Sequence, residues 1–187
     1  MEKFQQQDVD IIEETLAFDG FFKLKSLKLK HALFNGGQSA KIERELCVRG
    51  DAVGILLYDP QLKKFALVEQ FRIGVLGREQ SPWLLELVAG MLDKEGEAPE
   101  AVAKRETIEE SGLEVLAIKP VMEYFCSPGG STEYFSLFCG QVDLSGVQSA
   151  VFGVAEENED IRLHIIDVEQ VIERFHQGEF NNAMTII

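Results

Sequence analysis

Several glutamates between positions 97 and 110 have the spacing that brings carboxylates together on one face of a helix. Glu106, Glu109 and Glu110 stand three and four residues apart, so they fall within a sector of about 100°, and Glu97 lies one or two turns earlier. Like charges at these separations disfavour a helix by about a few tenths of a kcal/mol per pair, and a divalent cation reverses the sign. Mg²⁺ prefers a few carboxylates together with substrate phosphate oxygens. The spacing therefore predicts a magnesium site, beside which Arg105 can orient a carboxylate bidentately.

A solvated acidic face is the alternative explanation of this helix, and it is the better one for Glu109 taken alone. The whole set, however, lies between a glycine-rich entry and Gly112, with an apolar strand leading in. We predict a helix over residues 98–111, because Pro99 suits a first helical turn and Gly112 suits the position after the last one. The strand that leads into it is expected over residues 84–89.

Strands outnumber helices elsewhere but are interleaved with them, so the class is α/β or α+β. Residues 9–49 are strand-rich: apolar residues and lysines alternate, with one slip, over positions 22–30, and Asn35-Gly36-Gly37 is typical of a hairpin turn. Further strands are expected at residues 42–48, 52–58, 64–72, 115–124, 134–142 and 161–166. Helices are expected from residue 167 to about 176 and again near residue 181.

The composition is that of an ordinary globular chain: 187 residues, 45% hydrophobic and 27% charged. The net charge of −14 repels a phosphate backbone, and no apolar run reaches the ~20 residues of a membrane helix, so neither nucleic acid nor a membrane is an expected partner. Cys47, Cys126 and Cys139 lack C-x-x-C spacing, which disfavours zinc and indicates a reducing compartment. The N-terminus lacks the pattern of a signal peptide, so a cytoplasmic location is expected.

The segment from Gly90 to Leu113 resembles the Nudix box, G-x5-E-x7-R-E-U-x-E-E-x-G-U, in which U is apolar. Seven positions match in spacing, namely Glu97, Arg105, Glu106, Glu109, Glu110, Gly112 and Leu113. Two features differ: six residues instead of five separate Gly90 from Glu97, and Thr107 stands where an aliphatic residue is usual. The resemblance implies a Nudix-type α/β/α sandwich with a mixed sheet.

This resemblance also implies the chemistry, which is Mg²⁺-dependent hydrolysis of a nucleoside diphosphate linked to another moiety, with Mn²⁺ as the alternative ion. A diphosphate is inert until metal ions neutralise its oxygens and a base orients water for in-line attack. The matched positions assign metal ligation to Glu106, Glu110 and the backbone carbonyl of Ala89, with Glu97 and Glu109 as supporting acids.

Within the family, the chain is most similar to the ADP-ribose pyrophosphatase branch, over nearly its whole length. Pro128 lies fifteen residues beyond Leu113, at about the distance that marks this branch, although Pro-Gly is also an ordinary turn. The acidic run over residues 156–160 matches a mobile loop of similar enzymes. That match implies that Glu157 activates the attacking water and that Glu159 binds a further Mg²⁺. A loop base reaches its water only when the loop closes on substrate.

Positions that match similar enzymes imply a set of substrate-binding residues. Arginines would meet the diphosphate and the terminal ribose, acidic residues would accept from ribose hydroxyls, one of two phenylalanines would stack on adenine, and the others would line the cleft. For each arginine a surface ion pair is the alternative, and for the phenylalanines a place in the core or an interface. The arginines are Arg44, Arg49 and Arg72, the acidic residues are Glu45 and Glu133, and the phenylalanines are Phe21 and Phe22. The residues that would line the cleft are Met91, Ser127, Pro128 and Gly129. Trp83 is expected in the core or an interface.

We expect residues 1–49 to form an N-terminal β-rich part for dimerisation and substrate binding, and residues 50–187 to form the Nudix hydrolase domain. The resemblance implies a domain-swapped homodimer in which a partner subunit donates the adenine-stacking aromatic residue. The implied function is hydrolysis of ADP-ribose to AMP and ribose 5-phosphate. The alternatives are a pyrophosphatase acting on GDP-mannose or another nucleotide sugar, and a non-catalytic ADP-ribose sensor. The intact Glu106, Glu109 and Glu110 disfavour the sensor.

Overall fold

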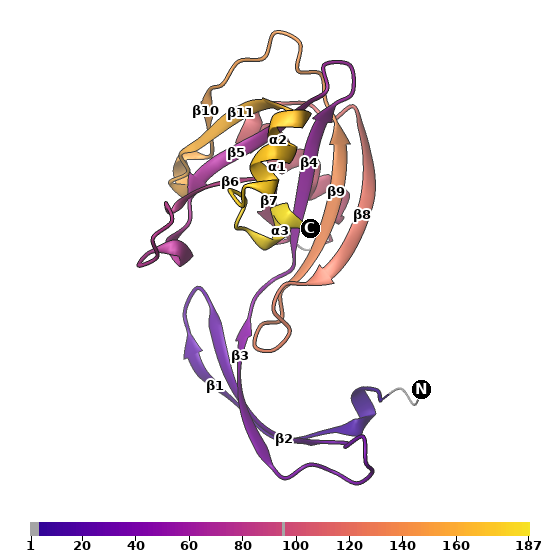
Figure 1. Ribbon diagram of the computed structural model, residues 1–187. Helices are drawn as coiled ribbons and strands as arrows, with labels where there is room; N and C mark the ends of the chain where they lie inside the picture. Colours follow the sequence, from indigo (N-terminus) through magenta and orange to yellow (C-terminus); the bar gives the residue numbers. More distant parts are fainter. Residues whose placement is uncertain (1–3, 95) are drawn as a thin grey trace. The chain divides into compact units, whose positions relative to one another are not determined.

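The computed structural model describes residues 4–94 and 96–187, which form two compact units (Figure 1). One unit reaches to Gly50 and includes the loop Ser127–Glu133, and the other comprises Asp51–Cys126 and Tyr134–Ile187. None of the helices in the described ranges has the length and the apolar run that crossing a bilayer requires.

The first unit is a three-stranded antiparallel sheet in the order β1-β2-β3. After the short helix η1 (Gln6–Asp8), its strands are β1 (Val9–Asp19), β2 (Lys23–His31) and β3 (Ile42–Val48). The predicted turn between β2 and β3 is confirmed, and Gly36 and Gly37 adopt the positive φ of 83° and 79° that glycine tolerates best. The slip in the alternation of β2 places Leu24 and Leu27 on opposite faces of the sheet. Every residue of β1 is exposed.

The second unit is built on a mixed sheet in the order β10-β11-β5-β4-β9-β8, with β6 paired to β5 and β7 paired to β4. Only the β4–β9 pair is parallel among the described pairings. The strands are β4 (Ala52–Asp59), β5 (Lys64–Phe71), β6 (Trp83–Glu86), β7 (Val88–Met91), β8 (Ala117–Phe125), β9 (Tyr134–Gln141), β10 (Val151–Phe152) and β11 (Ile161–Asp167). The short helix η2 (Ile73–Val75) follows β5.

Helices cover both faces of this sheet, so the expected α/β/α arrangement is confirmed. Val53, Ile55 and Leu57 of β4 pack with Val102 and Ala103 of α1 (Pro99–Ser111) in the larger apolar cluster. The alternate face of β4 contributes Ala52 to a second cluster, against which Met184 of α3 (Ala183–Ile186) packs. Figure 1 shows α2 (Val168–His176) and α3 in yellow, in front of the strands, and α2 contacts β11 and β5.

One detail of the sequence prediction is wrong, and another is narrowed. The single strand expected over residues 84–89 is two strands, since the chain breaks at Leu87 so that β6 pairs with β5 and β7 pairs with β4. Trp83 is 53% exposed and packs edge-on against Phe71, so of its two predicted places the core is excluded and an interface stays a prediction. The boundaries of the other expected strands agree with the structure to within about two residues.

Gly112, at the end of α1, is expected to be important for the stability of the protein. Gly112 has a φ of +67°, and a Cβ added there would lie 2.6 Å from Cε1 of Phe152. We therefore expect Gly112→Ala to lower the free energy of unfolding by about 3 kcal/mol, from left-handed backbone strain and displacement of the ring. Urea titration measures this loss. Gly74→Ala is the control, because its Cβ would meet nothing within 4 Å; equal losses in both variants would contradict the assignment.

Candidate functional site

The buried side of α1 changes from apolar to polar along the helix. Val102 and Ala103 enter the apolar core, whereas Thr107, Glu110 and Ser111 are buried polar residues one to two turns later. The two hydroxyl groups are satisfied within the helix: Thr107 donates to the carbonyl of Ala103 at 2.7 Å and Ser111 donates to that of Thr107 at 2.5 Å. These bonds offset the cost of burying hydroxyls. The carboxyl group of Glu110 is thus the ionisable group on the helix's buried side.

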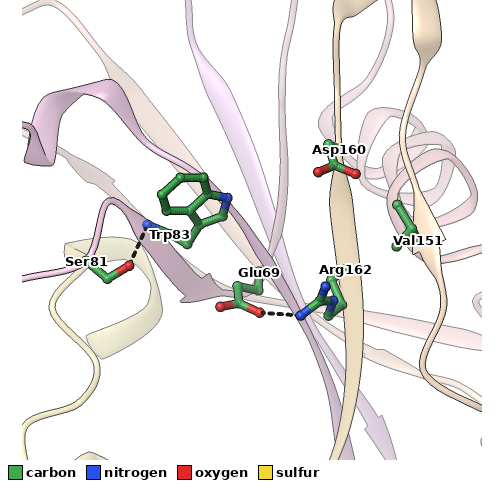
Figure 2. A pocket seen from close by; sticks show the side chains of 6 residues that line it. All are labelled: Glu69, Ser81, Trp83, Val151, Asp160 and Arg162. Atoms are coloured by element: carbon green, nitrogen blue, oxygen red, sulfur yellow. Dashed lines mark hydrogen bonds and ion pairs between the residues drawn. The ribbon is translucent and has the colours of Figure 1, made fainter.

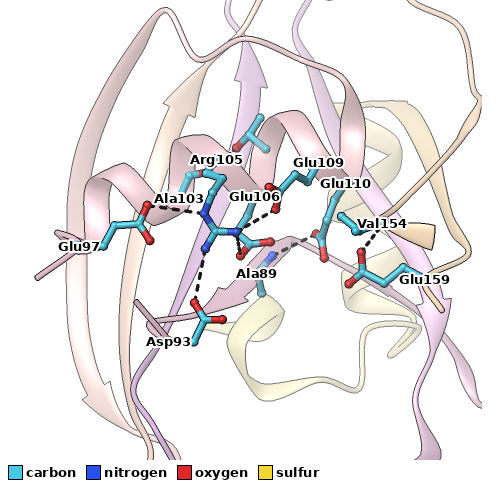
Figure 3. Close-up of polar contacts among 11 residues, drawn as sticks. Ala89, Asp93, Glu97, Ala103, Arg105, Glu106, Glu109, Glu110, Val154 and Glu159 are labelled. Atoms are coloured by element: carbon cyan, nitrogen blue, oxygen red, sulfur yellow. Dashed lines mark hydrogen bonds and ion pairs between the residues drawn. The ribbon is translucent and has the colours of Figure 1, made fainter. Parts of the chain in front are cut away.

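Arg105 is the centre of an ion-pair network on α1 (Figure 3). Its Nη1 lies 2.8 Å from Oε2 of Glu109 and 2.9 Å from Oε1 of Glu106. Its other nitrogens lie 3.6 Å from Glu97 and 3.9 Å from Asp93. Burial alone would lower the pKa of Arg105, but the surrounding carboxylates more than offset it and hold the pKa above its usual value. Arg105 therefore holds together acidic side chains that would otherwise repel each other.

Glu110 points away from this network, toward strand β7. Its side chain is only 2% exposed, and Oε2 accepts a hydrogen bond of 3.3 Å from the backbone N–H of Ala89. Burial, which has the largest effect, acts with the neighbouring Glu106 and Glu159 to raise the pKa of Glu110 to about 8, against the opposing effects of the Ala89 N–H and Arg72. A buried acid beside two others is an environment that a cation would stabilise.

Glu106 lies over a gap in β7 that only glycine leaves open. A Cβ at Gly90 would come within 2.1 Å of Cδ and 2.2 Å of Oε1 of Glu106. Because the sequence has glycine there, β7 can pass close to α1 and present the backbone of Ala89 next to Glu106 and Glu110. The Gly90 of the sequence motif thus has a steric explanation.

A third carboxylate reaches the same place from the loop between β10 and β11. Oε2 of Glu159 accepts a hydrogen bond of 3.0 Å from the N–H of Val154, and the N–H of Gly153 donates to the carbonyl of Glu109 at 3.2 Å. The first bond lies within the loop (Figure 3), and the second attaches the loop to the last turns of α1. The short helix η3 (Ala155–Glu157) lies inside this loop. The side chain of Glu157, the predicted base, lies outside the described part of the structure.

Arg72 pairs with a buried acid that the sequence did not reveal as important. Its Nε lies 2.8 Å from Oε2 of Glu86, whose side chain is 0% exposed. The other oxygen of Glu86 accepts a hydrogen bond from Nδ2 of Asn182. Burial raises the pKa of Glu86, although Arg72 and Asn182 oppose this. A glutamate between leucines in a short strand was the only available signal, and it is equally typical of a solvent-facing position.

Most of the other predicted substrate residues lie in the first unit. Arg49 pairs with Glu133 at 3.2 Å and lies over the ring of Phe22 at 5.0 Å, so three of the predicted residues come together. The backbone N–H of Arg49 donates to the hydroxyl of Thr132, and that hydroxyl donates to the carbonyl of Arg49. These two bonds attach the loop that contains Ser127, Pro128 and Gly129 to the end of β3. Phe21 is 90% exposed, which excludes a core position.

Three of the predicted substrate residues have other surroundings, namely Arg44, Glu45 and Met91. Arg44 and Glu45 are exposed on β3, and Arg44 donates to the carbonyl of Glu43. Met91, in the second unit, packs against the apolar cluster of Ala52 and Leu87.

A separate pocket of about 330 Å³ opens beside β5, β6 and β11 (Figure 2). It is lined by Glu69, Ser81, Trp83, Val151, Asp160 and Arg162. Its one cation, Arg162, lies 4.0 Å from Glu69. With two acids, Glu69 and Asp160, and one arginine, its lining has a net negative charge, which disfavours direct binding of a diphosphate.

Comparison with known proteins agrees with this geometry. The NUDIX domain matches residues 48–183. An ADP-ribose pyrophosphatase of Haemophilus influenzae is 43% identical over 190 residues, covering 100% of this chain and 87% of the relative. The chain belongs to the Nudix family.

Two further relatives are similar to the chain in sequence, and one solved structure is similar to it in fold. An ADP-ribose pyrophosphatase of Escherichia coli strain K12 is 43% identical, covering 98% of this chain and 87% of the relative. A GDP-mannose pyrophosphatase of Escherichia coli strain SMS-3-5 is 31% identical, covering 97% and 93%. The crystal structure of an ADP compounds hydrolase has the same fold, with a TM-score of 0.72 at 18% identity and coverage of 98% and 91%.

The Nudix box of this chain fits a divalent cation, which members of the family generally use. Glu106, Glu110 and Glu159 are oxygen donors close enough to influence one another electrostatically, and the backbone of Ala89 adjoins them. Among the described residues, no three acidic, histidine or cysteine side chains already form a metal cage. Oε1 of Glu106 is paired with Arg105, so a cation shared with Glu110 would compete with the guanidinium for the Glu106 carboxylate.

Both departures from the Nudix box have local explanations. Thr107 is fully buried where an aliphatic residue is usual, and its hydrogen bond to Ala103 makes the hydroxyl acceptable there. The longer entry places Asp93 within reach of Arg105, which gives the network a further acid. Glu95, inside this entry, lies outside the described residues.

The raised pKa of Glu110 predicts how the stability of this Nudix chain depends on pH in EDTA. The folded state holds a proton up to about pH 8, whereas the unfolded state loses it near 4.5. The folded state binds more protons between these values, so stability should fall by about 1.4 kcal/mol per pH unit in mid-window. Urea titrations at pH 5, 6, 7 and 8 measure the slope. Glu110→Gln should flatten it, and an unchanged slope in that variant would refute the attribution.

Proposed function

We propose that the chain hydrolyses ADP-ribose to AMP and ribose 5-phosphate in a reaction that depends on Mg²⁺. The observation that carries the proposal is the gathering of Glu106, Glu110 and Glu159 beside Ala89. The choice of substrate is supported by relatives named ADP-ribose pyrophosphatase, which are 43% identical over nearly all of the chain.

In this reaction water attacks one phosphorus of the diphosphate, and the bond from that phosphorus to the bridging oxygen breaks. Glu106, Glu110 and the carbonyl of Ala89 would hold one cation and Glu159 a further one, with Glu97 as a supporting acid. The cation, when bound, neutralises phosphate oxygens and makes water a better nucleophile. Glu157 accepts the proton of the attacking water, and Glu109 and Arg105 orient the other acids. Arg72 binds the diphosphate through the nitrogens that Glu86 leaves available.

The first unit supplies most of the remaining substrate contacts in this proposal. Arg44 and Arg49 bind phosphate or ribose, Glu45 and Glu133 accept from ribose hydroxyls, and Phe21 or Phe22 stacks on adenine. Exposed Phe21 is suited to stacking, which is worth about 1–3 kcal/mol per base. Ser127, Pro128 and Gly129 are further substrate-binding residues of this unit, and Met91 is one in the second unit.

A homodimer is part of the same proposal. Strand β1 is an edge strand with exposed Ile11, Ile12, Leu16 and Phe18, and a second copy would cover these apolar side chains. Sedimentation of the wild type and of Phe18→Ser tests this, with the wild type expected as a dimer and the variant shifted toward monomer. From the acidic composition and the N-terminal sequence, we also infer a cytoplasmic protein without nucleic-acid or membrane partners.

A pyrophosphatase acting on GDP-mannose is the second candidate, because a relative so named is 31% identical over 97% of the chain. The experiment that separates the two is chromatography of products after incubation with ADP-ribose or GDP-mannose, with Mg²⁺ and with EDTA. We expect AMP from ADP-ribose only when Mg²⁺ is present. Turnover of GDP-mannose alone would overturn the substrate, and tight ADP-ribose binding without turnover would point to a sensor.

A further inference from the structure

The buried carboxylate of Glu86 joins two side chains from distant parts of the chain. Oε2 accepts from Nε of Arg72, which follows β5, and Oε1 accepts from Nδ2 of Asn182, which precedes α3. A carboxylate that is 0% exposed is costly unless it is paired and hydrogen-bonded. Each oxygen of Glu86 accepts a hydrogen bond, so the buried charge is both paired and hydrogen-bonded. The two bonds also fix the positions of Arg72 and Asn182.

The pairing orients the guanidinium of Arg72. With Nε bound to Glu86, both Nη nitrogens lie at the other end of a rigid planar fork and remain able to donate elsewhere. The Arg72 side chain is 38% exposed, so a ligand can reach these nitrogens. Arg72 also interacts electrostatically with Glu110, which places the charge near the proposed metal ligands.

Asn182 is itself held in one orientation. Its Oδ1 accepts from the backbone N–H of Met184 at 3.0 Å, so its Nδ2 is the group presented to Glu86. Nearby, the hydroxyl of Thr185 accepts from the N–H of Leu87 at 3.3 Å, and Met184 packs against the cluster that contains Leu87. The start of α3 is thereby fixed at the break between β6 and β7, on the residue that follows Glu86.

We propose that Glu86, held in place by Asn182, is a positioning residue that fixes the guanidinium of Arg72 for binding the substrate's diphosphate. This inference rests on the proposed function of the carboxylate site. It gives the residues before and within α3 a part in substrate binding, although Asn182 is 96 residues from Glu86 in the sequence.

The first test is the kinetics of Glu86→Gln and Asn182→Ala with ADP-ribose and Mg²⁺. Each variant should raise KM about tenfold and change kcat less than about threefold, because a disordered Arg72 loses binding that substrate and transition state share. Glu179→Gln is the matched control, since Glu179 pairs with Arg174 at the surface, and its KM should be unchanged. Thermal melts show whether each variant is folded; Asn182→Ala removes no buried charge and so provides the result if Glu86→Gln unfolds.

The decisive test is a double-mutant cycle with Arg72→Ala. If Glu86 acts through Arg72, Glu86→Gln and Asn182→Ala should change KM less than about twofold when Arg72 is already absent. Equal fold-changes in both backgrounds, or a wild-type KM in Arg72→Ala, would overturn the proposal. The same cycle measured as the Kd of ADP-ribose by calorimetry needs no turnover. A wild type that binds without hydrolysing would therefore sink the proposed function alone, and one that neither binds nor hydrolyses would sink both.

Discussion

Replacement of Glu110 by glutamine is expected to lower kcat for ADP-ribose hydrolysis by about a thousandfold or more while the protein stays folded. The side chain is buried, and its carboxylate is a proposed metal ligand next to Glu106 and Glu159. Glutamine has nearly the same shape and can still accept the hydrogen bond from Ala89, but it lacks the charge that holds a cation. Initial rates of AMP formation at saturating Mg²⁺ measure the loss.

The control for this variant is Glu100→Gln, which makes the same change of charge in the same helix. Glu100 is exposed, and its Oε1 lies 2.8 Å from Nζ of Lys104 on the helix surface. Surface ion pairs contribute little, so Glu100→Gln should change kcat by less than about twofold. The melting temperature of Glu110→Gln in EDTA should match or exceed that of the wild type near neutral pH, because a neutral side chain replaces a buried acid. A near-wild-type rate for Glu110→Gln would show that Glu110 is not a metal ligand.

Gly90→Ala is expected to lower kcat by about a hundredfold or more, although it adds only a methyl group. That methyl would lie 2.1 Å from Cδ of Glu106, so either the carboxylate must leave or β7 must move away from α1. Either movement separates Glu106 from the backbone of Ala89. Rates measured against Mg²⁺ concentration should show that a higher metal concentration restores little of the loss.

Gly74→Ala again serves as the comparison, since a Cβ at Gly74 would meet no atom within 4 Å. Circular dichroism separates a displaced carboxylate from an unfolded chain. If Gly90→Ala is folded and turns over ADP-ribose at the wild-type rate, the close passage of β7 under Glu106 does not matter for catalysis. Glu106 would then have to bind the metal from another position.

Local signals in the sequence were sufficient to predict α1 and its acidic face. Pro99 and Gly112 bound the helix as expected, because a missing N–H is harmless in a first turn and a positive φ of 67° suits glycine. The spacing of Glu106 and Glu110 was enough to predict their proximity.

The break between β6 and β7 could not be predicted in the same way. Residues 84–89 form an apolar run interrupted by one glutamate and contain no glycine or proline to mark a break. The break arises because β6 pairs with β5 and β7 pairs with β4. The burial of Glu86 has a similar origin, since Asn182 becomes its neighbour only in the folded chain. Such tertiary pairings leave no local pattern.

The ion pairs around Arg105 have a consequence for how the site is loaded. Glu106 and Glu109 already share a positive group covalently attached to their own helix, within 2.9 Å of each. A metal ion bound by Glu106 would therefore compete with a counter-ion that is already tethered beside it. The measured affinity for metal would then reflect the difference between two cations, and Arg105 would remain to balance part of the acidic charge when the metal ion leaves.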